Sequence, residues 1–393
     1  MSLEVRNERL SAWLLFLLFL GFAWFEFGLV LTSNNKLYQQ GLVLLFWLPS
    51  FFLLVDCFWK GEFSNCYFAL FFVFLMLLFW AVLSLWWTGA VEQFREFKRV
   101  LYVGLFVFLC FVFGLRRSEW IPSLLLMLSL GAYGIMLSSL LVFFFDGGDY
   151  LSRRLTPLGG YSHPILGGYA LIALSLYFLM WVYLKSRTAV VAAFVVALIF
   201  VFATQSRGLI GAYVFSLICL LFWFGGRKLL QCVGLLLLLF ASIFWDELVA
   251  RGGSYRVEIF SVGLSMISQS PWLGLGLGSS YDISGGESGL VFDNVHNLVL
   301  HFAIELGLVG AALWCMLWLL VLRTALTLRA TTEGVWLSIL WLFSSVACLT
   351  DVAYSWETPA AEWFVSWWPV GAAFMLQGGA RAARDSRPVR KAA

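Results

Sequence analysis

Long apolar runs alternate with short polar breaks along most of the chain. Each run covers roughly 16–25 residues, close to the length that a helix needs to cross the hydrocarbon core of a bilayer. Charged residues, glycine or proline bound the runs, as they do at the ends of membrane helices. The pattern predicts an all-α fold, a polytopic transmembrane helical bundle with about twelve spans. The predicted spans are Ser11–Leu31, Gly41–Phe58, Tyr67–Trp87, Val100–Leu115, Ile121–Phe145, Ile165–Leu184, Ala189–Ala203, Leu209–Phe224, Leu229–Trp245, Leu306–Leu322, Val335–Thr350 and Trp363–Gln377.

The composition agrees with a lipid environment. Hydrophobic residues make up 62% of the chain and charged residues 12%, whereas soluble domains carry about 25% charged residues. The net charge of +3 is an average over two sides of a membrane, so it gives no indication of a nucleic-acid partner. The seven cysteines form no C-x-x-C pair and are expected to be small buried apolar side chains. No removable signal peptide is expected, because the first apolar run spans the membrane and lacks a cleavage site.

Basic residues in short loops set the orientation of membrane proteins, because they stay on the cytoplasmic side. With twelve spans both termini share one side, and sixteen of the 25 basic residues fall there. We therefore expect cytoplasmic termini. Nine basic residues remain on the outer side, where the orientation bias does not place them, which suggests that this side uses positive charge to bind a ligand. They are Lys36, Arg95, Lys98, Arg99, Arg153, Arg154, Arg207, Arg251 and Arg256. For Arg95, Lys98 and Arg99 the simpler expectation is pairing with Glu92 and Glu96.

The longest polar stretch, Asp246 to Asn294, is predicted to be an outer, periplasmic loop, and such long loops are usually functional. Within it, Tyr255–Ser270 places Phe260, Leu264 and Ile267 on one helical face, and Pro271 ends the helix. An amphipathic helix in this position should lie flat at the membrane surface. The predicted organisation is nine spans (1–245), the partly helical loop (246–305), three spans (306–378) and a basic cytoplasmic tail (379–393).

Arginines on the outer side are candidates for binding an anion. Arg207 lies between two apolar runs with almost no loop, where it either anchors the helix at the interface or faces a polar cavity. A guanidinium in a cavity offers a rigid fork of donors that suits phosphate oxygens. Arg251 and Arg256 flank the start of the loop helix, whose N-cap is expected at Ser254, and a helix N-terminus favours anions. The alternative is that these two arginines are solvated.

Two further features follow Pro271. Gly274, Gly276 and Gly278 predict either a tight re-entrant turn or backbone N–H groups exposed to an anion. His296 is expected in the first turn of the next short helix, where the helix dipole keeps the imidazole neutral and suited to act as a general base. The alternative is a capping or structural histidine. His301 and Glu305 are spaced to pair with each other.

Metal and nucleotide chemistry are not expected. His163, on the outer side, is the third histidine of the chain, and no H-E-x-x-H spacing or acidic cluster is present. No P-loop occurs, so ATP use is not expected. The prediction is a site without metal or cofactor.

Three stretches resemble the O-antigen ligase and polymerase superfamily. They are TQSRGLIGAY (Thr204–Tyr213), YRVEIFSVGLSMISQSPWLGLGLG (Tyr255–Gly278) and HNLVLHFAIELGLVG (His296–Gly310), about an eighth of the chain. The order of Arg-Gly, Tyr-Arg, Pro with Gly-x-Gly, and His-Asn ahead of Glu-x-Gly-Leu-x-Gly is similar to the pattern of that superfamily. The remainder is similar in its number of spans and in its large late loop.

The resemblance implies a glycan donor on undecaprenyl diphosphate, an inverting transfer in the periplasm and no metal. Residue by residue, it implies that Arg207 and Arg256 bind the diphosphate, and that His296 deprotonates or positions the acceptor hydroxyl. Further contacts to the substrates are expected from Arg251, Arg153, Arg154, His163, Tyr255 and Asn297. The length is typical of the ligases, which use lipid A–core as acceptor, but the polymerases are of similar length.

The expected protein is thus an O-antigen ligase of the bacterial inner membrane, with an O-antigen polymerase as the alternative. Its partners would be the undecaprenyl-diphosphate-linked O-antigen, lipid A–core and membrane lipids, with no nucleic acid. A transporter is the competing class, but it should carry intramembrane charges in two related halves. The ionisable residues here gather instead on the outer side, in the second half of the chain.

Overall fold

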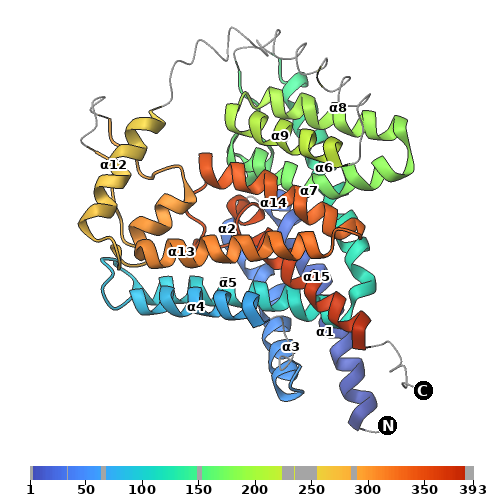
Figure 1. Cartoon of the computed structure of the whole chain (residues 1–393). Coiled ribbons are helices and arrows are strands. Elements are labelled where there is room, and N and C mark those ends of the chain that lie inside the picture. Colours follow the sequence, from blue (N-terminus) through green and yellow to red (C-terminus); the bar gives the residue numbers. More distant parts are fainter. Residues whose placement is uncertain are drawn as a thin grey trace.

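Helices form nearly all the regular structure in the computed structural model, which describes residues 3–32, 34–62, 68–147, 153–223, 234, 255–284 and 290–385 (Figure 1). Side chains are described within these ranges except at 3–10, 187 and 221–223. No strand occurs within the same ranges, which contain only an isolated antiparallel bridge between Ile283 and Phe292. The predicted all-α class is confirmed.

The helices follow the apolar runs of the sequence. The first half contains α1 (Leu3–Leu31), α2 (Asn35–Leu42), a π-helical turn η1 (Val43–Trp47), α3 (Leu48–Trp59), α4 (Phe68–Ser84), α5 (Gln93–Arg116), η2 (Ser118–Trp120), α6 (Ile121–Phe145), η3 (Gly159–Tyr161) and α7 (Leu166–Lys185). The second half contains α8 (Arg187–Ala203), α9 (Arg207–Trp223), α12 (Arg256–Gln269), α13 (Leu298–Thr327), α14 (Thr332–Thr350), η4 (Ala361–Phe364) and α15 (Trp367–Asp385).

Seven helical segments of the described chain are long and apolar enough to cross a membrane, so the chain is a membrane protein. They are Ser11–Leu31, Asn35–Trp59, Gln93–Arg116, Ser118–Phe145, Leu166–Lys185, Leu298–Thr327 and Thr332–Thr350. Three shorter apolar helices, at Phe68–Ser84, Thr188–Ala203 and Arg207–Leu220, coincide with further predicted spans. The predicted span Leu229–Trp245 lies outside the described residues. The total of about twelve spans therefore stays a prediction.

The last helix occupies the interior of the bundle. Every residue from Trp363 to Gly379 is buried, and α15 packs along α5 through aromatic contacts such as Phe106 to Trp368, with ring centroids 6.5 Å apart. The buried amide of Gln377 donates to the hydroxyl of Thr324 at 2.7 Å. A helix that faces protein tolerates polar groups that lipid would not. The helix begins at Trp367, later than the predicted Trp363, because Ala361–Phe364 form a 3-10 turn.

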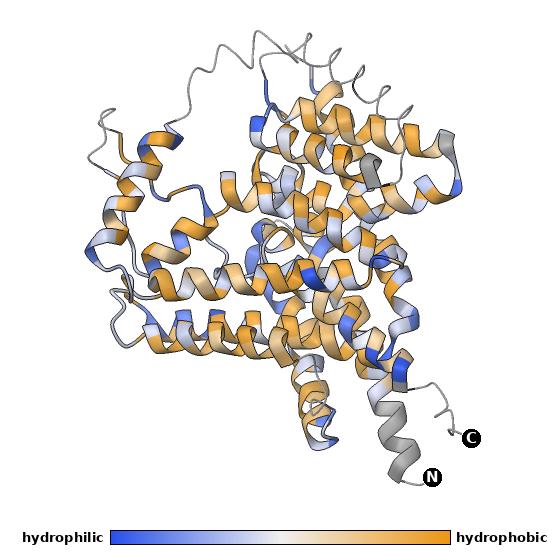
Figure 2. Cartoon of the chain, in the orientation of Figure 1, coloured by the Kyte–Doolittle hydropathy of each residue, from blue (hydrophilic) through white to orange (hydrophobic). Residues whose placement is uncertain are grey.

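Polar residues gather at the two ends of the molecule. Figure 1 shows α12, the start of α13 and the connection between α4 and α5 at one end, while both termini lie at the other. Figure 2 shows that hydrophobic residues dominate most helices and that many of the hydrophilic residues lie at helix ends and in the connections. The candidate site residues on α9, α12 and α13 all stand at or near helix starts, on the side of the structure away from the termini.

Candidate functional site

Four helices begin around the end of α14. Tyr169, in the first turn of α7, donates to Oδ2 of Asp351 at 2.8 Å, and Arg256, the first residue of α12, donates to Oδ1 at 2.6 Å. Gly208, next to the start of α9, lies so close that a methyl group there would be 2.5 Å from Oδ2. The amide of Asn297, the N-cap of α13, donates to the carbonyl of Leu349 at 3.1 Å. We call this region the Asp351 site.

Three of these helix starts thus place a group close to the Asp351 carboxylate, and the fourth, that of α13, contacts the backbone of α14 two residues before it. Helix N-termini carry partial positive charge and unpaired N–H groups, so such a place favours anions. The side chain of Asp351 is 6% exposed, and that of Arg256 is 41% exposed. Asp351 thus orients Arg256 from within the protein and leaves much of the guanidinium accessible to a ligand.

The sequence pattern alone assigns no role to Asp351. The available signal was its position directly after Val335–Thr350, because that end lies on the same predicted side as the arginines. An acidic residue at such a span end is a candidate partner for an outer arginine, although the sequence does not say which one.

Arg207 is placed as predicted, at a helix start with almost no preceding loop. It is exposed, whereas Thr204, Gln205 and Ser206 before it are buried. Gln205 has a left-handed backbone (φ 52°), which turns the chain sharply from α8 into α9. The structure therefore brings Arg207 and Arg256, which are far apart in sequence, to two helix starts on either side of Asp351.

Arg154 and His163 also border this region. Nε of Arg154 donates to the carbonyl of Thr204 at 3.0 Å, and Nδ1 of His163 accepts from the backbone N–H of Leu166 at 3.1 Å, which caps α7. Partial burial lowers the pKa of His163, and the positive charge of Arg154 lowers it further, while Asp351 acts in the opposite direction. His163 therefore favours the neutral form that its capping role requires.

Arg153 has a different place. Its guanidinium pairs with Asp146 at 3.0 Å, donates to the carbonyl of Phe143 at 2.7 Å and lies over the Phe143 ring. These contacts tie it to the C-terminal end of α6. Arg251, another predicted substrate contact, lies outside the described residues.

His296 lies before α13 and not in its first turn, which corrects the sequence prediction. The helix begins at Leu298, and Asn297 is the N-cap, its side chain accepting from the N–H of Leu300 at 3.0 Å. His296 has φ 47°, and its backbone N–H donates to the side chain of Asn294 at 2.8 Å. Asn297 caps the start of α13, so a capping role for His296 is not required. The His296 ring is half-buried.

The loop helix α12 begins at Arg256 with Tyr255 as its N-cap residue, and not with Ser254 as predicted. Ile259 and Gly263 are buried, and Ile259 belongs to a small apolar cluster with Val295 and Ile304. Phe260 and Leu264, two residues of the predicted apolar face, are exposed. This exposed apolar face is consistent with a helix on the membrane surface, which stays a prediction.

The glycine run forms a turn, and its backbone N–H groups are already paired within the protein. The N–H of Leu275 donates to the carbonyl of Ile304, and that of Gly276 to the carbonyl of Glu305, both at 2.8 Å. The N–H of Gly278 donates to Oε1 of Glu305 at 3.2 Å. The alternative of N–H groups exposed to an anion is therefore wrong for these positions.

Gly307 explains why the turn lies there. It has φ 68° and ψ −179° within α13, so the helix is broken at this residue and its preceding carbonyls lose their usual partners. The glycine loop supplies N–H donors to these carbonyls, and Pro271 accepts from the N–H of Leu308 at 2.7 Å. Backbone groups at membrane depth must be paired within the protein, and here a loop completes the pairing.

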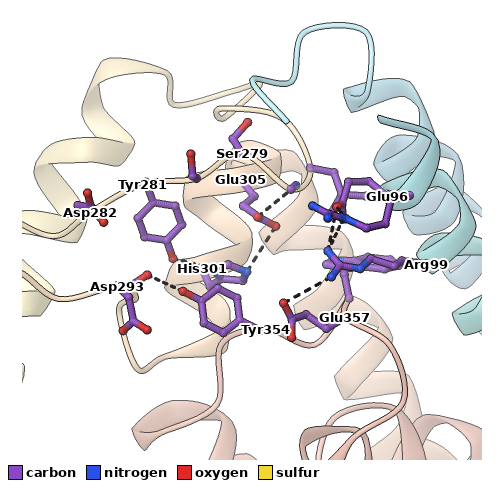
Figure 3. Close-up of a pocket in the computed structure, with 15 residues that line it drawn as sticks. Glu96, Arg99, Ser279, Tyr281, Asp282, Asp293, His301, Glu305, Tyr354 and Glu357 are labelled. Atoms are coloured by element: carbon purple, nitrogen blue, oxygen red, sulfur yellow. Dashed lines mark hydrogen bonds and ion pairs between the residues drawn. The ribbon is translucent and has the colours of Figure 1, made fainter. Parts of the chain in front are cut away.

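A polar pocket of about 510 Å³ lies on the other side of the same loop (Figure 3). We call it the Glu305 pocket. Its wall comes from the start of α5, the loop after the glycine run, the first half of α13 and the segment after α14. The lining residues are Arg95, Glu96, Arg99, Leu277, Gly278, Ser279, Ser280, Tyr281, Asp282, Asp293, His301, Glu305, Tyr354, Trp356 and Glu357.

Charged pairs and hydrogen bonds order this pocket. The carboxylate of Glu96, 2% exposed, accepts from Arg99 at 2.8 Å and from Arg95 at 3.2 Å, which confirms the expected pairing for these two arginines. His301 lies 3.4 Å from Glu305, as its spacing predicted, and shares a hydrogen bond of 2.6 Å with Tyr281. Sequence reasoning gave His301 no part in the site, because only the fold shows that its side chain lines a pocket.

The two regions differ in what they can bind. The Asp351 site offers helix starts and arginines to an anion, and a histidine that can take up a proton. The Glu305 pocket offers hydroxyl, carboxyl and ring N–H groups. Among the residues that the structure describes, no three His, Cys, Asp or Glu side chains are grouped as metal ligands.

Comparison with known proteins agrees with the sequence pattern. A protein family described as O-antigen ligase matches residues 172–315, which include Arg207, Arg256 and His296. An O-antigen ligase of Pseudomonas aeruginosa (strain PAO1) is 27% identical to this chain over 315 residues, which cover 78% of the chain and 77% of the relative. The resemblance to the O-antigen ligase superfamily is confirmed.

Proposed function

We propose that this relative of the O-antigen ligases is an inverting glycosyltransferase. It moves O-antigen polysaccharide from undecaprenyl diphosphate onto lipid A–core, at the periplasmic face of the bacterial inner membrane. The observation that carries the proposal is the gathering of the starts of α7, α9, α12 and α13 around the end of α14, where Arg256 pairs with Asp351. The matched family and the similar ligase support the reaction class.

Arg207 and Arg256 hold the donor diphosphate. The leaving diphosphate gains negative charge as the glycosidic bond breaks, so fixed donors aimed at it stabilise the transition state. Arg256 is held by Asp351 at 2.6 Å, which orients its fork of donors before the substrate arrives. Two guanidinium groups and several helix starts supply this charge without a metal ion or other cofactor.

His296 acts as the general base. An acceptor hydroxyl must lose a proton as it attacks the anomeric carbon, and a neutral imidazole within hydrogen-bond reach can take it. His296 lies on the short segment between Asp293 and the N-cap Asn297, beside the positive start of α13.

Chemical analysis of lipopolysaccharide in cells that lack the protein tests the function. Lipid-linked polymer that accumulates without reaching the core is the expected result for a ligase. Core that carries a single repeat unit would instead indicate an O-antigen polymerase. Unchanged lipopolysaccharide would contradict both activities and would favour a transporter.

The proposed sidedness has its own test. Cysteines introduced at Ser279, in the pocket loop, and at Ser386, in the basic tail, are treated with an impermeant thiol reagent from outside. Labelling at Ser279 alone agrees with a periplasmic site and a cytoplasmic C-terminus. Labelling at Ser386 alone would invert the topology and contradict the proposed location of the reaction.

A further inference from the structure

We infer that the Glu305 pocket binds a phosphate-free sugar residue of one of the two glycan substrates. This inference rests on the proposed transferase function. The volume of about 510 Å³ lies within the range of roughly 300–1,000 Å³ that is common for small-molecule sites. The pocket is separate from the Asp351 site and has the opposite balance of charge.

The balance of charge argues against a phosphate ligand. Five carboxyl groups line the pocket, from Glu96, Asp282, Asp293, Glu305 and Glu357, against the two guanidinium groups of Arg95 and Arg99. Both guanidinium groups already contact Glu96, and Arg99 also lies 3.6 Å from Glu357. Little positive charge is left for a phosphate. No three of the carboxyl groups are grouped as ligands of one cation within the described residues.

Neutral hydroxyl groups suit the pocket better. Carboxylates and hydroxyls accept and donate to sugar hydroxyls, and Tyr281, Tyr354 and Trp356 add aromatic surface to the wall. Burial raises the pKa of Tyr281, and it raises the pKa of Tyr354 to about 12, so both hydroxyls stay protonated. The pocket therefore presents both donors and acceptors, as a polyhydroxyl ligand requires.

Two buried donors in the wall have no acceptor within the described residues. Trp356 is 4% exposed, and its ring N–H finds no partner among the described residues. Such unpaired donors are rare in native proteins, because each costs free energy when buried. A sugar oxygen in the pocket would be a suitable acceptor. Nε of Arg99 is likewise buried and has no partner in the described part of the chain.

The pocket shares its wall with the Asp351 site. The hydroxyl of Tyr354 donates to the carbonyl of Asp293 at 2.5 Å, and both residues line the pocket. His296 follows Asp293 by three positions, and Asp351 precedes Tyr354 by three. A sugar bound here would thus be held by the same two segments that carry the proposed base and the partner of Arg256.

Direct binding measurements on the full chain in lipid nanodiscs test this inference. Two soluble probes distinguish the source of the sugar. One is core oligosaccharide, freed of lipid and dephosphorylated, and the other is O-antigen repeat unit freed of its lipid carrier, both from cells that make this protein. We expect one of them to bind, and binding to weaken about three- to tenfold in Trp356→Phe and in Asp282→Asn, since each loses about one hydrogen bond.

Trp86→Phe is the matched control, because Trp86 is 86% exposed and does not line the pocket. It should bind the probes as the wild type does. Inorganic diphosphate should not compete. Wild-type affinity in both pocket variants, tighter diphosphate binding in Asp282→Asn, or no binding of either probe would each overturn the inference.

Transfer from lipid-linked donor to acceptor is measured in parallel. A wild-type protein that binds sugar as described but transfers nothing would contradict the proposed function and leave the sugar pocket in place. A protein that transfers glycan while its pocket variants bind and react like the wild type would contradict the pocket alone.

Discussion

The Asp351 site and the Glu305 pocket lie on neighbouring parts of the same two segments, but they are built on opposite electrostatic principles. In the first, the buried carboxylate of Asp351 accepts from Tyr169 and Arg256, near the starts of four helices. In the second, one buried carboxylate, that of Glu96, pairs with two arginines inside a pocket rich in carboxyl groups. Adjacent charge patterns of this kind can sort the parts of a glycolipid substrate, with phosphate on one side and sugar on the other.

The largest expected effect concerns His296. General-base assistance contributes about 10²–10⁴-fold to a rate, so His296→Ala should reduce turnover by that factor while donor binding largely persists. Turnover of purified protein and donor affinity are measured side by side. Near-wild-type turnover in a folded His296→Gln protein would show that the residue only positions the acceptor through hydrogen bonds.

The next effect concerns the arginines of the Asp351 site. Arg207→Ala and Arg256→Ala should each lower kcat/KM by about 10²–10³-fold, because each removes charge that the leaving diphosphate needs. Arg→Lys should still lower it, since the bidentate fork is lost. Arg329→Ala, an exposed arginine at the turn between α13 and α14, is the control. If the site variants match that control in transfer assays, the diphosphate does not bind there.

A smaller effect tests how the glycine loop supports the pocket. Gly278 has φ 74°, and a methyl group there would lie 2.5 Å from Cγ of Glu96. Gly278→Ala should therefore cost about 1–3 kcal/mol of stability, visible as a lower unfolding temperature in detergent. Gly134→Ala in α6 is the control, because the added methyl group meets no atom within 4 Å. Equal unfolding temperatures for the two variants would argue against a strained loop.

The smallest effect is a pH dependence from His163. Its pKa in the folded protein is below the ordinary value of 6.5, so protonation favours unfolding. The stabilising contribution is fully present above pH 6.5 and is lost as the pH falls below that value. His163→Asn keeps an acceptor for the N–H of Leu166 but does not titrate in this range. Its unfolding temperature should fall less on acidification than that of the wild type, and an identical pH profile would contradict the capping role.

Much of the fold follows from local pattern. The predicted span Ile121–Phe145 matches α6 at both ends, and Pro271 marks the end of α12 as expected, because apolar length and helix breakers act over a few residues. Pairs within one helix, such as His301 with Glu305, could also be predicted from the sequence. The contact of Arg256 with Asp351 could not be predicted, because it joins residues 95 positions apart.

The position of His296 shows a second limit. Asn294, Asn297 and Asp293 are all plausible N-caps by residue type, and the sequence does not decide between them. The structure selects Asn297, and the left-handed backbone at His296 follows from the sharp turn before it. The break at Gly307 is equally invisible in the apolar pattern, which continues through it.

The break in α13 also has a consequence for biogenesis. The carbonyls of Ile304 and Glu305 are paired by Leu275 and Gly276, and Trp80 of α4 donates to the carbonyl of Leu306 at 2.8 Å. The helix around Gly307 therefore cannot be completed as an independent unit when it leaves the ribosome and partitions into lipid. Its backbone pairing requires two partners that precede it in the chain, which are Trp80 of α4 and the glycine loop directly before α13. The maturation of this membrane segment is thus coupled to the same loop that shapes the sugar pocket, so a chain that has not assembled the loop has no finished pocket.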